Sequence, residues 1–198
     1  LRDRGEGGED VAAFLSDPLL YSILTGEQSS FDLRETMDRG KILLVNLAKG
    51  RIGEGPASLL GSLLVSHIAL AGLGRADTPQ AERRDFFLYL DEFQTLATLS
   101  LATMLSELRK YSVNLILAHQ YLSQTEPAIV DAILGNVASL VTFRVGPSDA
   151  TFLAKEFEPP FDASDLINLP NHSICVKLMV DGSVAKPFSA ETVAPDPL

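Results

Sequence analysis

Two adjacent acids, Asp91 and Glu92, are the residues whose position in the sequence most directly suggests chemistry. They follow an apolar run in the stretch "FFLYLDEFQ", which begins at Phe86 and has the composition of a buried β-strand. An unpaired carboxylate is unfavourable in a core, so we expect both acids just past the end of that strand. There, one carboxylate could hold Mg²⁺, which prefers oxygen ligands. The other could orient and deprotonate an attacking water. The alternative is an ordinary strand exit whose acids are solvated.

Two further polar residues, Gln120 and Arg109, stand where they could serve the same chemistry. Gln120 ends a second apolar run, residues 113–120. A neutral amide at the tip of a neighbouring strand can hydrogen-bond a phosphate without repelling it; otherwise it is a loop-facing polar residue. Arg109 lies near the end of a predicted amphipathic helix, where a cation suits the helix dipole. It could instead meet a phosphate across a subunit boundary and stabilise the charge of phosphoryl transfer.

The elements that must position these residues alternate between strands and helices. Apolar runs predict strands at residues 41–48, 86–91, 113–120 and 139–145. Helical patterns lie at residues 11–24, 30–40, 56–74, 99–112, 127–135 and 147–157. This alternation indicates an α/β fold with a mostly parallel sheet and helices on both faces. The last segment, 172–192, predicts a C-terminal β-hairpin that turns at "DGS". In open α/β sheets the chemistry gathers at the carboxyl ends of the strands, where the acids and Gln120 are expected.

Length and composition are those of one ordinary globular domain. The chain has 198 residues, of which 46% are hydrophobic and 21% charged. We expect a single domain over 1–198, with flexible ends at 1–10 and 194–198. The only cysteine, Cys175, excludes an internal disulfide framework and a cysteine-rich metal site, and is expected in the core. The apolar stretch 59–73 is shorter than the roughly 20 residues of a membrane span, which predicts a buried core helix.

The net charge of −10 argues against a surface coated with Lys and Arg for nonspecific nucleic-acid binding. It leaves room for a local basic loop. The segment "KGRIGEG" is short, basic and glycine-rich, and its Lys49 and Arg51 are candidates for contacting DNA phosphates. The alternative for this segment is a plain surface turn between a strand and a helix.

Five blocks of the sequence, taken in order, resemble the HerA/FtsK-type DNA translocases. The closest resemblance is to the TraD/TraG-like coupling ATPases of type IV secretion and conjugation, and it extends over about residues 15–193. In this family the acids after an apolar strand form the Walker B motif. The blocks are "KILLVNLAKGRIGEG", "FFLYLDEFQTLAT", "LSELRKYSVNLILAHQYLSQ", "ILGNVASLVTFRVGPSDATFLAKEF" and "DGSVAKPFSAET".

The resemblance implies a RecA-like P-loop ATPase that assembles as a homo-hexameric ring and uses ATP and Mg²⁺ to move DNA. Asp91 matches the Walker B acid associated with Mg²⁺, and Glu92 matches the general base. Gln120 matches the amide that senses the γ-phosphate, and Arg109 the arginine finger that acts on a neighbouring subunit. Arg144, in "FRVG", is a second candidate for an inter-subunit contact, with a salt bridge at the edge of the core as its alternative.

One motif of the family, the phosphate-binding G-x-x-x-x-G-K-[ST], is absent from the sequence. We therefore expect this chain to be the C-terminal half of a longer ATPase, without the Walker A segment and inactive by itself. The expected partners are DNA, further copies of the protein, and secretion-system or relaxosome proteins. The expected location is cytoplasmic, at the inner face of the membrane only through regions outside this chain. The alternatives are a non-hydrolysing assembly or docking module with vestigial ATPase features, and a different nucleotide-dependent enzyme such as a kinase or packaging motor.

Overall fold

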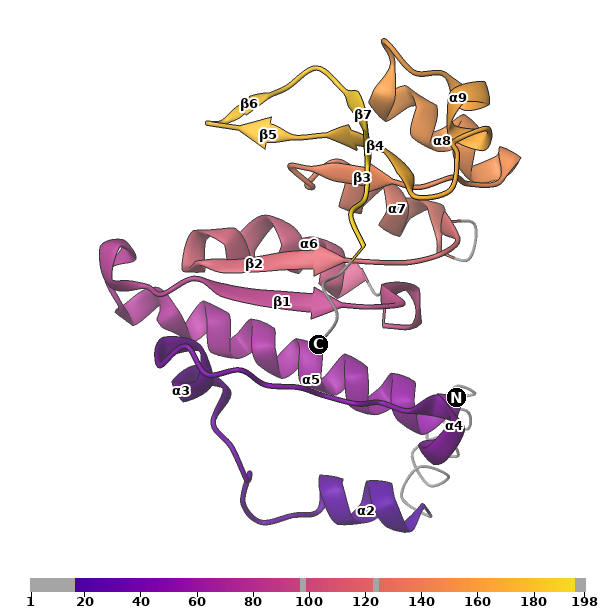
Figure 1. Cartoon of the computed structure of the whole chain (residues 1–198). Helices are drawn as coiled ribbons and strands as arrows, with labels where there is room; N and C mark the ends of the chain where they lie inside the picture. Colours follow the sequence, from indigo (N-terminus) through magenta and orange to yellow (C-terminus); the bar gives the residue numbers. More distant parts are fainter. Residues whose placement is uncertain (1–16, 97–98, 123–124, 195–198) are drawn as a thin grey trace, which may run out of the picture. The chain divides into compact units, whose positions relative to one another are not determined.

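The computed structural model of the chain describes residues 17–96, 99–122 and 125–194 (Figure 1). The chain divides into two compact units, Leu1–Ala118 (unit 1) and His119–Leu198 (unit 2). The predicted flexible ends lie outside the described residues, apart from residue 194, and so does the first part of the predicted helix 11–24. The expectation of one domain over 1–198 stays a prediction.

Unit 1 is built on a parallel pair of strands, β1 (Phe86–Leu90) and β2 (Val113–Leu117). A parallel pair needs a crossover connection, which is supplied by helix α6 (Leu99–Leu108) and the 3₁₀ turn η4 (Arg109–Tyr111). The carboxyl ends of both strands therefore lie at one edge of the pair and the amino ends at the other. The two strands predicted at 86–91 and 113–120, and their parallel arrangement, are confirmed.

The core of unit 1 lies on one face of this pair. Three helices contribute to it, namely α3 (Leu33–Asp38), α5 (Glu54–Gly74) and α6. On the opposite face the side chains of Phe87 and Tyr89 are 54% and 72% exposed. Among the described residues of unit 1 the helices pack on one face of the pair, and helices on both faces stay a prediction.

The segment 41–48 is not a strand, although its sequence is as apolar as that of β1. Ile42 and Leu44 are 89% and 90% exposed, and no described residue pairs with the segment in a sheet. A strand forms only where a neighbouring chain accepts its hydrogen bonds, so the apolar pattern alone was insufficient. The segment leads into a short helix, α4 (Lys49–Ile52), where a glycine-rich loop was predicted.

Three helices of unit 1 confirm their predictions to different degrees. Helix α2 (Pro18–Leu24) begins after Asp17, whose side chain caps two backbone N–H groups. Helix α3 lies within the helical pattern predicted at 30–40 and is capped by Asp32, whose side chain accepts the N–H of Glu35. Helix α5 belongs to the one described helical stretch, Glu54–Asp77, that is long and apolar enough to cross a membrane by length and composition. It buries one side and leaves Leu63, Leu70 and Leu73 exposed, so the predicted core helix is buried on one side only.

Unit 2 contains a three-stranded antiparallel sheet in the order β3 (Leu140–Thr142), β4 (Ser173–Lys177), β7 (Phe188–Glu191). The ribbon β5 (Met179–Val180) and β6 (Ser183–Val184) joins β4 to β7, which confirms the C-terminal hairpin. The strand predicted at 139–145 exists, but it pairs antiparallel with β4 and is no part of the β1–β2 pair. Its apolar sequence identified a strand and carried no information on its direction.

Three helices pack against this sheet: α7 (Pro127–Leu134), α8 (Pro147–Phe157) and α9 (Ala163–Ile167). Phe157, Leu166 and Cys175 are completely buried in the shared core. The core position predicted for Cys175 is thus confirmed. Burial raises the pKa of its thiol, so the residue stays a neutral core side chain rather than a nucleophile.

Candidate functional site

The turn after β1 carries Asp91 and Glu92 at the carboxyl edge of the parallel pair. Glu92 adopts a left-handed conformation with φ 49°, which is uncommon for a residue other than glycine and is frequent at functional sites. Its N–H donates to Asp91 Oδ1 at 3.0 Å. The end of β2 holds the turn: Phe93 N–H donates to the carbonyl of Ala118 at 3.1 Å, and Ala118 N–H donates to Leu90 at 2.9 Å. Both acids therefore stand just beyond the strand, as predicted.

The carboxylate of Glu92 is oriented by a residue that the sequence did not single out. Gln94 lies in the 3₁₀ turn η3 (Phe93–Thr95), and its Nε2 donates to Glu92 Oε2 at 2.6 Å. Thr95 Oγ1 donates to the Glu92 carbonyl at 3.0 Å, and Ser58 Oγ of α5 donates to the Thr95 carbonyl at 2.8 Å. The only feature of the sequence that could have pointed to Gln94 is its position two residues after Glu92. These bonds fix the acid turn to helix α5.

Arg109 lies at the opposite end of the parallel pair. It begins η4, which precedes β2, so it stands at the amino edge while Asp91 and Glu92 stand at the carboxyl edge. Five residues of strand separate the two edges, or roughly 15 Å. The Arg109 side chain is exposed and forms no ion pair with any residue that the structure describes. The structure thus does not bring Arg109 to the two acids within one chain.

Two other arginines hold the backbone around Arg109. Arg75 is completely buried, and its guanidinium donates to the carbonyl of Tyr111 at 2.9 Å and to Arg84 at 2.6 Å. Its Nε donates to Asp38 Oδ1 at 3.0 Å. Arg83 donates to the Lys110 carbonyl at 2.5 Å and lies over the Tyr111 ring, 5.2 Å from its centroid.

Arg75 is buried although it opens a polar segment, 75–85, most of whose residues are exposed. Its neighbours Arg83 and Arg84 are arginines too, and nothing in the residue types separates Arg75 from them. Only the carbonyl groups that converge on Arg75 from distant segments make its burial favourable, because a buried charge requires hydrogen-bonding partners.

Gln120 belongs to unit 2, where it lines a cavity of ≈ 340 Å³ together with Arg144 and Asp149. Asp149 is buried in the first turn of α8, and its Oδ2 accepts the N–H of Leu122 at 3.1 Å. This bond holds the segment that carries Gln120. Two residues that the sequence proposed separately, Gln120 and Arg144, thus face one cavity.

Arg144 is not in the salt bridge that was its alternative. Its Nη2 donates to the amide oxygen Oδ1 of Asn171 at 3.1 Å, and the side chain meets no carboxylate among the described residues. Lys49 and Arg51, the candidate DNA contacts, are both exposed. They lie on the helical turn α4 rather than on a loop, because the segment 49–52 closes helical hydrogen bonds from Ala48 onward.

The acids do not form a metal site from protein ligands alone. In the described part of the chain, no three His, Cys, Asp or Glu side chains are grouped so that they could hold a metal. An exposed carboxylate such as that of Asp91 fits Mg²⁺, which keeps several waters and binds through one or two carboxylates plus substrate phosphates. The geometry therefore fits a magnesium ion that arrives with a phosphate-bearing ligand.

Comparison with known proteins finds a family model that matches part of the chain. Residues 85–156, which include the acid turn, β2 and α8, match the family described as the TraM recognition site of TraD and TraG. The resemblance to TraD/TraG-like coupling proteins is thereby confirmed. A search among curated proteins gives no match.

Several solved structures have the same fold. The plasmid coupling protein TrwB in complex with ADP and Mg²⁺ has 18% identity and a TM-score of 0.66, covering 89% of this chain and 46% of that one. TrwB in complex with the ATP analogue ADPNP has 18% identity and a TM-score of 0.63, covering 92% and 49%. The genome packaging NTPase B204 from Sulfolobus turreted icosahedral virus 2, in complex with AMPPCP, has 11% identity and a TM-score of 0.55, covering 95% of both chains. The chain therefore spans about half the length of TrwB.

Proposed function

Because residues 85–156 match the TraD/TraG family, we propose that this chain is the C-terminal catalytic part of an ATP-driven DNA translocase, a coupling ATPase of type IV secretion. It would complete a RecA-like core and act as a homo-hexamer with ATP and Mg²⁺. The observation that carries the proposal is the acid turn. Asp91 and Glu92 end a strand of a parallel pair, and Gln94 holds the Glu92 carboxylate at 2.6 Å. The TrwB complexes with ADP, Mg²⁺ and ADPNP support the choice of nucleotide.

The two acids divide the chemistry between them. Asp91, exposed at the edge, would hold the metal that accompanies the nucleotide. Mg²⁺, when bound, neutralises charge on the transferred phosphoryl group. Glu92 would accept a proton from the attacking water. Its backbone is held by Thr95 and its carboxylate by Gln94, so little reorganisation is needed before it acts.

The remaining site residues would act from further away. Gln120 is proposed to bind the γ-phosphate through its amide. Arg109 stands at the far edge of its own β1–β2 pair, which favours a role as an arginine finger in the site of a neighbouring subunit. The backbone just after it is held by Arg75, which donates to the Tyr111 carbonyl, and by Arg83, which donates to the Lys110 carbonyl. Arg144 is proposed as a second inter-subunit contact.

Nucleic-acid contact is assigned to α4. Lys49 and Arg51 are exposed on this turn, and both can contact phosphates without reading bases. Relaxosome or secretion proteins are further proposed partners, consistent with the description of the matched family. A cytoplasmic location, with membrane contact only through segments outside this chain, completes the proposal.

The second candidate is a packaging motor rather than a conjugation protein. It is favoured by B204, which matches this chain over 95% of both lengths, whereas TrwB is covered by about half. Ring assembly and the dependence of ATP turnover on the length of double-stranded DNA are the measurements that would separate the two candidates.

Glu92→Gln in a full-length protein carrying this chain tests the catalytic assignment. We expect kcat for ATP to fall at least about 100-fold while nucleotide binding is kept, because the amide cannot accept the proton. Glu82→Gln, at an exposed position in the same unit, is the matched control and should leave kcat unchanged. Unchanged turnover in Glu92→Gln would remove the general base and with it the proposal.

Arg109 is tested by mixing two inactive variants. Rings formed from Arg109→Ala and Glu92→Gln subunits contain some interfaces in which both intact residues meet. Recovery of activity on mixing is expected if Arg109 serves its neighbour. Activity that stays at the level of the separate variants would contradict a trans-acting role.

A further inference from the structure

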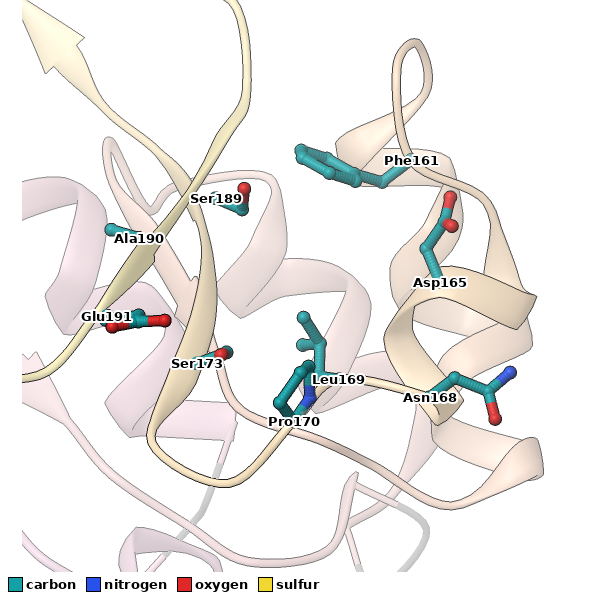
Figure 2. Close-up of a pocket in the computed structure, with 9 residues that line it drawn as sticks. All are labelled: Phe161, Asp165, Asn168, Leu169, Pro170, Ser173, Ser189, Ala190 and Glu191. Atoms are coloured by element: carbon teal, nitrogen blue, oxygen red, sulfur yellow. The ribbon is translucent and has the colours of Figure 1, made fainter.

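A second cavity lies in unit 2, outside the residues that match the TraD/TraG family. It has a volume of ≈ 480 Å³ and is formed between helix α9 and the adjoining ends of β4 and β7 (Figure 2). Phe161 and Asp165 approach it from the helical side, and Ser173, Ser189 and Glu191 from the strands (Figure 2). No residue of the proposed ATPase site contributes to it.

The strand beside this cavity has an open edge. In the described part of the chain β7 pairs only with β4, in the order β3-β4-β7. Thr192 N–H donates to the carbonyl of His172 at 2.8 Å. Along an antiparallel strand, the backbone groups of successive residues point alternately toward and away from the partner strand. Because Thr192 bonds toward the β4 side, Ser189 and Glu191 direct their N–H and C=O groups away from β4. These groups are available to another extended chain.

The lining of the cavity is acidic on one side and apolar on the other. Asp165 and Glu191 supply two carboxylates, while Phe161 and Leu169 supply apolar surface, and no Lys, Arg or His is among the lining residues. Asp165 Oδ2 accepts the N–H of Asp162 at 2.9 Å, which fixes the side chain in a capping box. A ligand side chain with a long apolar stem and a positive end would match both kinds of surface.

Ser173 points independently to a ligand. The residue is only 9% exposed and lies on the wall of the cavity, yet its hydroxyl makes no hydrogen bond to any described residue. The hydroxyl oxygen is reached from the cavity, so a bound ligand could take the place of water on it. Figure 2 shows its oxygen directed toward the space between the strands and α9.

We propose that the β7 edge and this cavity together bind an extended peptide of a partner protein, with a Lys or Arg side chain in the cavity. The peptide would add a strand beside β7 through the outward groups of Ser189 and Glu191. Alternate side chains of an added strand point to the same face, so one of them would enter the cavity and meet Glu191 and Asp165.

The charge of unit 2 favours a basic partner over a second copy of this chain. Residues 119–198 contain four Lys or Arg and ten Asp or Glu. Two such acidic units would repel each other, whereas a basic segment would be attracted. The proposal is independent of the ATPase function, so either can fail without the other.

The test measures fluorescence anisotropy of a labelled decapeptide of alternating Val and Lys, titrated with the 198-residue chain. We expect saturable binding that is lost in a Val and Glu peptide of equal length. Binding should also weaken about tenfold or more when alternate backbone nitrogens of the Lys peptide are methylated, because the strand can then no longer pair. Equal binding of the methylated peptide would overturn strand addition.

Variants localise the site. Glu191→Gln should weaken binding of the Lys peptide about threefold, as expected for a partly exposed charge pair. Asp181→Asn removes the same charge from the β5–β6 turn, outside the cavity, and should leave the affinity unchanged. Equal effects of the two variants would reduce the binding to general charge attraction. Analytical ultracentrifugation of the chain without peptide tests for a dimer. A dimer that becomes more stable in Glu191→Gln would assign the β7 edge to a second copy of the chain and overturn the proposal.

Discussion

Arg75 in unit 1 and Ser173 in unit 2 are both buried polar side chains, but only one of them is satisfied by its own chain. Arg75 is completely buried and donates to Asp38 and to the carbonyls of Tyr111 and Arg84. Ser173 is 9% exposed, and its hydroxyl makes no bond to a described residue. The contrast is between a polar group that holds the scaffold and one whose hydroxyl is left to solvent or to a ligand in the cavity. In unit 1 internal bonds brace the segments that carry Arg109 and Glu92, while unit 2 leaves a cavity and a strand edge open.

The largest expected effect in this comparison comes from Arg75→Met. Removing the buried guanidinium takes the donor from Asp38 and from the carbonyls of Tyr111 and Arg84, and we expect a loss of about 3–5 kcal/mol in the free energy of unfolding. Urea denaturation measures the loss, and hydrogen exchange should show it in unit 1 while unit 2 stays protected.

Arg39→Met is the matched control for Arg75→Met. Arg39 directly follows helix α3, which carries Asp38, the partner of Arg75. The Arg39 side chain is 71% exposed and pairs with Glu35 at 3.2 Å. We expect a change below about 1 kcal/mol there. Equal losses in the two variants would show that burial of Arg75 contributes nothing to the scaffold.

A smaller effect is expected where helix α5 approaches the acid turn. A Cβ added at Gly61 would lie 2.5 Å from Leu96 and 2.9 Å from Leu47, so both leucines must shift in Gly61→Ala. We expect a loss of about 1–3 kcal/mol in thermal or urea unfolding. Gly50→Ala, in the exposed helix α4 with nothing within 4 Å of the new Cβ, should be neutral or slightly stabilising. A neutral Gly61→Ala would mean that α5 does not pack closely on this turn.

The smallest effect is expected for Ser173→Ala. Because the hydroxyl has no partner in the described chain, its removal should change the free energy of unfolding by no more than about 0.5 kcal/mol. The same variant should weaken binding of the Val and Lys peptide. A loss of stability like that of Arg75→Met would show that Ser173 is satisfied internally, and the contrast between the two units would disappear.

Much of the local structure was predictable from the sequence. The turn at "DGS" and the strand just before Asp91 depend on residues close together in the chain, and both were identified. The same apolar signal failed at 41–48, which has no pairing partner among the described residues. Arg75 was missed because its partners Asp38 and Tyr111 are distant in the chain, and Gln94 because its bond to Glu92 depends on the left-handed turn at Glu92.

The sequence by itself determined the alternation of strands and helices and the placing of two acids just after an apolar strand. Periodicity and turn chemistry are local properties, and a carboxylate is excluded from a strand core wherever the chain is folded. The tertiary structure alone decided which apolar segments pair, which of several arginines is buried, and where a strand edge meets an acidic cavity. Those outcomes depend on hydrogen-bonding partners far apart in sequence, such as the carbonyls of Arg84 and Tyr111 that converge on Arg75.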